Sequence, residues 1–212
     1  VASNASCRYK VPANDSDGTN WIVRTFDDSA WSSGLSGLGY DTKSPAPYGA
    51  LFGTTVPPGT IDLYTRFAFA VPAGKSYSSL TLRVKYDDGF IAYLNGVEVA
   101  RANALANAVY NSLAPVAMNF DITKFEEYDI SAFLPQVMTG ASTNVLAVHV
   151  LNCTSGSSDL LFQPELLAGI PEVVTNIAVN EFMALNGATL KNSLGKYEDW
   201  IALYNPNTNS VS

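Results

Sequence analysis

The stretch YDDGFIAYLNGVEV, residues 86–99, decides the fold of this chain. Runs rich in apolar residues, at 90–94 and 97–100, flank the pair Asn95-Gly96. An Asn-Gly pair favours a two-residue turn in which both central residues have positive φ, and such a turn joins two antiparallel strands. The stretch therefore predicts a tight β-hairpin.

Three further segments have the pattern of strands. Residues 61–69 and 80–86 alternate apolar and polar side chains, which is typical of strands with one face buried and one in water. In the first of these, Asp62 and Arg66 form the polar face. Residues 144–152 are apolar on both faces, which predicts a central strand. Because no segment shows sustained helical periodicity, the sequence predicts an all-β antiparallel sandwich.

The composition limits the class of protein. The 212 residues include 12 Lys and Arg against 19 Asp and Glu, a net charge of −7, and 47% are hydrophobic. So many apolar residues exclude a disordered chain. The acidic balance lacks the positive patch that nucleic acids and acidic lipids require. No apolar run reaches the roughly 18 residues of a membrane helix. A low charged fraction with many aromatics is typical of an extracellular β-rich protein, so we expect secretion or attachment to a cell surface.

A break in the pattern falls at residues 169–172, Gly-Ile-Pro-Glu. Pro171 has no N–H to donate to a strand ladder, so we place a domain boundary there. The predicted organisation is a first domain at 1–170, a linker at 171–176 and a second domain at 177–212.

Residues 8–170 resemble the galactose-binding-like jelly rolls. The resemblance rests on FDDSAW at 26–31, GLGY at 37–40 and the stretch 86–99. Such domains are accessory modules of secreted bacterial proteins and N-terminal modules of family-two glycoside hydrolases. The resemblance implies a jelly-roll β-sandwich.

Residues 177–204 resemble the opening of a bacterial lamin tail domain, an immunoglobulin-like sandwich. VNEFMA at 179–184 and DWIALYNP at 199–206 carry this resemblance, although the family usually has Glu where Ala202 stands. The family's domain is longer than the residues present, so we expect this one to be incomplete. Its apolar residues would then be covered by further protein or by a partner, including a second copy of the chain.

Aromatic residues are the first candidates for a ligand site. Trp31 would offer a stacking surface to a sugar ring. Alternatively, residues 27–29 form an Asp-rich turn and Trp31 covers the edge of the core. Tyr40 is a second candidate for an exposed aromatic, and its alternative is a core tyrosine with a satisfied hydroxyl.

The pair Asp87-Asp88 lies at the end of a predicted strand, where ligand loops gather. Adjacent carboxylates suit Ca²⁺, which takes six to eight oxygen ligands, and sugar hydroxyls would complete its shell. The alternative is a turn rich in Asp and Gly. With Asn152 as a further hydrogen-bonding residue, Asp87 and Asp88 form the predicted polar part of the site.

The two cysteines, Cys7 and Cys153, are 146 positions apart in the sequence. A disulfide between them would close a long loop and contribute about 4–5 kcal/mol in the chain-entropy model. The alternative is two buried free thiols.

No catalytic set is evident. His149 is the only histidine, and we interpret it as a packed imidazole. The sequence offers no Ser-His-Asp set, metal-ligand cluster or phosphate-binding loop, and no motif identifies an acid and a nucleophile among its carboxylates. We therefore expect a non-catalytic extracellular module that binds a polysaccharide or glycan. The alternatives are a structural spacer that assembles through its incomplete second domain, and an accessory domain of a larger glycoside hydrolase.

Overall fold

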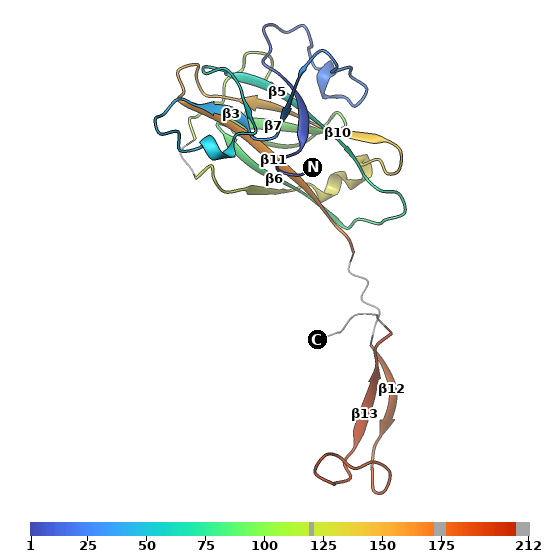
Figure 1. The fold of residues 1–212 in the computed structure, drawn as a ribbon. Helices are drawn as coiled ribbons and strands as arrows, with labels where there is room; N and C mark the ends of the chain where they lie inside the picture. The colour runs from blue at the N-terminus through green and yellow to red at the C-terminus, as the bar shows by residue number, and fades with distance from the viewer. Residues whose placement is uncertain (119–120, 172–176, 207–212) are drawn as a thin grey trace. The chain divides into compact units, whose positions relative to one another are not determined.

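The computed structural model describes residues 1–118, 121–171 and 177–206. The chain divides into two compact units, Val1–Pro171 and Glu172–Ser212. The first unit is a sandwich of two β-sheets (Figure 1). Within the described ranges, no helix is long and apolar enough to cross a membrane.

One layer of the first unit is a six-stranded sheet in which all neighbouring strands are antiparallel. Its strands, in spatial order, are β2 (Ser32–Leu35), β1 (Ser6–Lys10), β5 (Asp62–Ala70), β10 (Thr143–Leu151), β7 (Gly89–Leu94) and β8 (Val97–Ala102).

The other layer is a five-stranded sheet with one parallel pair, β3 with β4. Its strands are β4 (Thr54–Thr55), β3 (Leu38–Asp41), β11 (Asp159–Gly169), β6 (Ser79–Asp87) and β9 (Glu126–Asp129). Short 3₁₀ helices, η1 (Asn20–Ile22), η2 (Gly49–Leu51) and η3 (Ser131–Gln136), lie in the connections.

The chain crosses repeatedly between the two sheets. β5, β7 and β10 belong to the six-stranded sheet, whereas β6, β9 and β11 belong to the five-stranded sheet. Alternation of this kind is the connectivity of a jelly roll, as opposed to a simple meander. The prediction of an all-β sandwich is confirmed.

The predicted hairpin joins β7 to β8. Asn95 and Gly96 have φ values of 52° and 96°, the positive values that the turn requires. The Asn95 amide also donates to the Asn144 side chain and accepts a hydrogen bond from the Val145 N–H, both at 2.8 Å. The turn residue therefore ties the hairpin to the start of β10.

A second apolar cluster covers the outer face of the six-stranded sheet. Its buried members are Trp21, Trp31, Tyr64, Val145 and Ala147. Residues 20–31 thus form a cap over the outer face of the strands. The alternation of apolar and polar residues predicts that this face is exposed to water. The prediction that β5 has one wet face is wrong for this reason.

Arg66 holds this cap in place. Its side chain is only 2% exposed and pairs with Asp28 at 2.6 Å. The guanidinium also donates to the backbone carbonyls of Trp21, Val23 and Phe26. A buried cation is tolerated when its donors are satisfied in this way.

The two cysteines are free, which corrects the predicted disulfide. The register places Cys7 on β1 beside the row that contains Phe67 and Leu146. From Leu146 to Leu151, β10 extends about 17 Å at 3.4 Å per residue, and Cys153 follows beyond that end. A disulfide needs Cα atoms within about 7 Å, so the two cysteines are too far apart to form one.

The described part of the second unit is one antiparallel hairpin of β12 (Ala178–Met183) and β13 (Trp200–Tyr204), with a bulge between Val179 and Glu181. One face carries four residues that are 60–69% exposed, namely Val179, Phe182, Ile201 and Leu203. The immunoglobulin-like sandwich and its lamin tail resemblance remain predictions. Residues 172–176 of the predicted linker and the end of the predicted domain at 207–212 lie outside the described residues.

We expect Arg66→Met to destabilise the protein by about 3 kcal/mol, because the change leaves Asp28 and three backbone carbonyls without their buried donor. Urea unfolding at neutral pH measures the effect. Arg83→Met is the matched control: its side chain is 31% exposed and pairs with Glu127 and Glu165, so its cost is at most about 1 kcal/mol. Equal losses in the two variants would contradict the role assigned to Arg66.

Candidate functional site

The ends of several strands meet at one end of the first unit. Asp41 at the end of β3 lies opposite Asp159 at the start of β11, and Asp87 at the end of β6 lies opposite Leu161. A cavity of about 400 Å³ opens among them. Its polar lining consists of Lys43, Tyr48, Asp87, Asp88, Ser157, Ser158 and Asp159. We call it the polar cavity.

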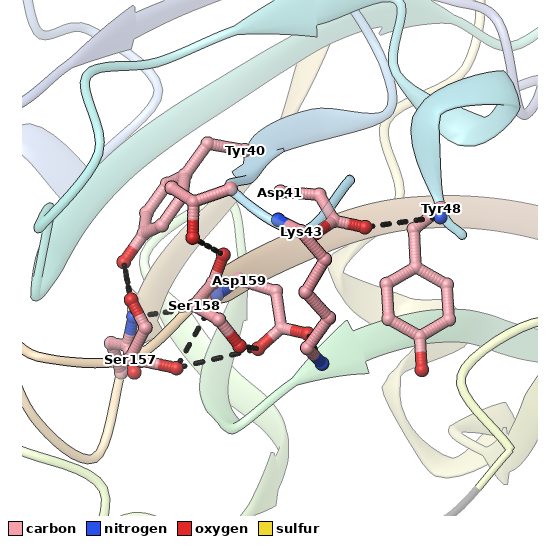
Figure 2. A network of polar contacts seen from close by, with 9 residues as sticks. Tyr40, Asp41, Lys43, Tyr48, Ser157, Ser158 and Asp159 are labelled. Carbon is pink, nitrogen blue, oxygen red and sulfur yellow. Dashed lines mark hydrogen bonds and ion pairs between the residues drawn. The ribbon is translucent and has the colours of Figure 1, made fainter. Parts of the chain in front are cut away.

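Asp41 shapes one wall of the polar cavity. Its carboxylate accepts hydrogen bonds from the backbone N–H of Lys43 at 2.9 Å and of Tyr48 at 3.2 Å (Figure 2). An aspartate that bonds the backbone two residues ahead forms a local turn. The two amides therefore place the side chains of Lys43 and Tyr48 at the rim.

Asp159 is the centre of the polar contacts. One of its oxygens pairs with Lys43 Nζ at 3.0 Å, and the other accepts from the hydroxyls of Ser158 at 3.2 Å and Ser157 at 3.4 Å. The neighbouring carboxylate raises the pKa of Lys43. Lys43 Nζ lies 5.9 Å from the centre of the Tyr48 ring, so an aromatic ring stands beside the charged groups (Figure 2).

Asp88 has a structural role. Its two oxygens accept the backbone N–H of Met118 at 2.7 Å and of Cys153 at 2.8 Å. Burial acts to raise its pKa, but the hydrogen bonds it accepts outweigh burial and lower it. Asp88 therefore fastens two connecting segments to the floor of the polar cavity.

Asp87 is placed differently, although it is the neighbouring residue. Its side chain is buried and lines the polar cavity, and its carboxyl group hydrogen-bonds to that of Asp88. Burial raises the pKa of Asp87, and the negative charges of Asp88 and Asp159 add to the effect. Two adjacent carboxylates do not both ionise easily, so the raised pKa of Asp87 favours its protonated form.

Tyr40 and Asn152 lie behind the polar cavity and do not line it. Both are almost fully buried, with exposed fractions of 1% and 0%. The Tyr40 hydroxyl donates to the Ser157 carbonyl at 3.2 Å and accepts from the Asn152 amide at 3.1 Å, which also donates to the Asp159 carbonyl at 3.1 Å. Their burial corrects the expectation that they contact a ligand: they position the loop at 157–159, which lines the polar cavity.

Trp31 is not an exposed stacking surface either. It is 7% exposed and packs in the outer apolar cluster, 6.2 Å from the centre of the Trp21 ring and 5.7 Å from that of Phe26. The alternative, in which Trp31 covers the edge of the core, is the arrangement observed. The reason is the cap of residues 20–31, which sequence alternation does not reveal.

The polar groups do not fit calcium. In the described part of the chain, no three side chains of the His, Cys, Asp and Glu types are grouped to hold a metal. Each oxygen of Asp88 already accepts a backbone N–H, and the Asp87 carboxyl is paired with that of Asp88. Because Ca²⁺ takes six to eight oxygens, this donor set is too small and too occupied. The residues of the polar cavity therefore do not support the predicted calcium site.

The residues that sequence analysis missed are Lys43, Tyr48 and Asp159. The signal that they share is their place in the sequence, because they lie in or next to loops at the ends of β3 and β11. Binding residues are often found in such loops. The pairing of β3 with β11 brings them together, and that pairing joins segments more than 100 residues apart.

Comparison with known proteins gives the following results. No protein-family model and no curated protein matches the chain. Among solved structures, a Bacteroides uniformis β-glucuronidase bound to a cyclophellitol-type aziridine matches with 16% identity and a TM-score of 0.45, over 76% of this chain and 17% of that one. A Bacteroides vulgatus β-glycosidase matches with 14% identity and a TM-score of 0.46, over 86% and 22%. An uncultured Clostridium β-glucuronidase matches with 19% identity and a TM-score of 0.40, over 70% and 21%.

The aligned part thus spans less than a quarter of these enzymes. The all-β sandwich follows from the strands described above.

We expect Asp87→Asn to remove a pH dependence of stability. Because the folded state raises the pKa of Asp87 above its ordinary value of 3.8, the folded protein keeps a proton that the unfolded chain releases. The wild-type protein therefore loses stability as the pH rises from about 5 toward the raised pKa, by at most about 1.4 kcal/mol per pH unit. Urea unfolding between about pH 5 and about pH 9 measures the loss, which Asp87→Asn lacks.

Asp129→Asn is the control for this measurement. Asp129 is exposed, and its pKa is lowered by its hydrogen bonds to Ser131, so it stays ionised throughout the range. Its stability difference from the wild type is therefore constant with pH. The same constant difference for Asp87→Asn would show that Asp87 does not hold a proton.

Proposed function

We propose that the first unit is a non-catalytic carbohydrate-binding module and that the polar cavity is its site. The observation that carries the proposal is the Tyr48 ring beside carboxylate, hydroxyl and ammonium groups in one cavity. A sugar ring has an apolar C–H face and a rim of hydroxyls, so it needs both kinds of surface at once.

The polar groups supply both partners for a sugar hydroxyl. The Asp159 carboxylate accepts hydrogen bonds, Lys43 donates them, and the hydroxyls of Ser157 and Ser158 do either. The buried carboxyl of Asp87 adds one more hydrogen-bonding group inside the cavity. A cavity of about 400 Å³ falls in the range of small-ligand sites and has room for one or two sugar rings.

The same contacts favour binding over hydrolysis. A glycosidase needs one carboxyl group as an acid and a second carboxylate free to act as nucleophile or base. In the polar cavity, Asp88 is held by two backbone amides and Asp159 is held by Lys43 and two serines. This leaves Asp87 without a reacting partner. We place the module in a secreted or surface-attached bacterial protein, where glycans are the abundant ligands.

A glycan array with the full chain, with and without chelator, tests the proposal and identifies the sugar. We expect binding that the chelator leaves unchanged. Tyr48→Ala then weakens the selected glycan at least about tenfold by isothermal titration calorimetry, because the stacking surface is lost. Tyr48→Phe keeps the ring and stays within about threefold of the wild type. No binding at millimolar sugar, or equal affinities of the two variants, would overturn the proposal.

A second candidate function, assembly, is favoured by the apolar face of the hairpin in the second unit. Two-stranded hairpins are marginally stable alone, and four exposed apolar residues on one face favour contact with another surface. If the chain assembles this way, light scattering shows a mass that rises with concentration, and Phe182→Lys with Ile201→Lys returns it to a monomer. A constant monomeric mass at high concentration would exclude assembly.

A further inference from the structure

A second cavity lies on the outer side of the six-stranded sheet, away from the β3 and β11 loops that form the polar cavity. It has a volume of about 100 Å³ and is lined by Trp21, Tyr64, Tyr93, Tyr110 and His149, together with Asp15. We call it the aromatic cavity. Its size admits a group of only a few heavy atoms, since a water molecule takes up about 30 Å³ of the liquid.

The rings around the cavity contact one another in two ways, one pair in parallel and the others edge to face. Tyr64 stacks on Trp21 with 4.3 Å between ring centres and 10° between planes. Tyr93 stands at 83° to Trp21, and His149 stands at 83° to Tyr64. Tyr93 and Tyr110 also line the cavity beside this pair, and the π-face of an aromatic ring attracts a cation that lies within about 6 Å of the ring centre.

Carboxylates surround the same space. Asp15 is exposed and lines the cavity, while Asp62 is buried beneath it in contact with His149. Burial raises the pKa of Tyr64, and the charges of Asp62, Asp15 and Asp17 raise it further, so the region favours positive charge. Lys10 is already paired with Asp17 at 2.6 Å.

The loop that carries Tyr110 is fixed in advance of any ligand. The Asn111 N–H donates to Asp62 at 2.7 Å, and the Tyr110 hydroxyl donates to the Ala13 carbonyl at 2.9 Å. Two anchors hold the fourth ring in place, so a ligand does not have to order it.

We propose that the aromatic cavity binds a methylated ammonium group, such as the trimethylammonium head of a small ligand or of a modified glycan or lipid. A primary ammonium needs acceptors for three N–H groups, and a wall of rings offers few of them. A methylated ammonium needs none and gains from the π-faces and the carboxylates together. This site is distinct from the polar cavity and does not depend on the carbohydrate-binding proposal.

Choline chloride is the probe, titrated into the full chain by isothermal titration calorimetry and followed by ligand-observed NMR. Its neutral isostere, 3,3-dimethyl-1-butanol, is the matched ligand. We expect choline to bind saturably in the millimolar range and at least about tenfold more tightly than the isostere. Absence of saturable choline binding, or equal binding of the isostere, would overturn the proposal.

Two pairs of variants test the groups involved. Tyr93→Leu removes a ring and weakens choline at least about fivefold, whereas Tyr93→Phe stays within about twofold. Asp15→Asn, an exposed change that leaves the fold intact, weakens choline about threefold, whereas Asp129→Asn outside the cavity has no effect. Choline binding that is insensitive to both Tyr93→Leu and Asp15→Asn would place the ligand elsewhere and refute the proposal.

One further variant separates the two sites. Tyr48→Ala, in the polar cavity, leaves choline binding unchanged even where it abolishes sugar binding. If Tyr48→Ala weakens choline, the ammonium binds in the polar cavity and the assignment to the aromatic cavity is wrong.

Discussion

The structure of the first unit depends on burying β10 on both of its faces. This strand pairs with β5 along nine residues and with β7 along six, so it lies inside the six-stranded sheet. Leu146, Val148 and Val150 face the core between the sheets. Val145 and Ala147 alternate with them and face outward, where they would lie in water if the sheet had no further cover. The cap of residues 20–31 is the consequence of that constraint.

The cap in turn explains why charged groups are buried in this sheet. Arg66 is directed outward from β5 and would be solvated on an open face. Under the cap it becomes the donor for three carbonyls of the capping segment and the partner of Asp28. His149 and Asp62 are neighbours on the same face and pair with each other for the same reason. The aromatic cavity is the space that remains between this polar pair, the cap and the loop at Tyr110.

The sequence predicts the strands well and their surroundings poorly. The Asn95-Gly96 turn and the doubly apolar strand at 144–152 depend on local pattern alone, and both occur as expected. Alternation at 61–69 predicts the strand correctly, but it also predicts that one face of the strand is exposed to water. That face is covered by residues 20–31, which have no periodic pattern to indicate the contact. The loops around Trp31 and Tyr40 allow either exposed or buried rings. Contacts with distant segments bury both. The polar cavity could be predicted only in part, since Asp87 and Asp88 are local whereas Lys43 and Asp159 meet through long-range pairing.

Three aspartates are buried among the described residues, and they differ in how their charge is satisfied. Asp62 accepts the Asn111 N–H and contacts His149, and Asp88 accepts two backbone amides. Each of these carboxylates has its hydrogen-bond partners built into the fold and supports the structure. Asp87 faces the polar cavity with a second carboxylate beside it and takes up a proton instead. The Asp87 carboxyl pairs with that of Asp88 and also lines the cavity, where a ligand hydroxyl can reach it. We therefore propose that Asp87, Asp159 and the Tyr48 ring recognise the ligand, whereas Asp88, Tyr40 and Asn152 support the surrounding loops.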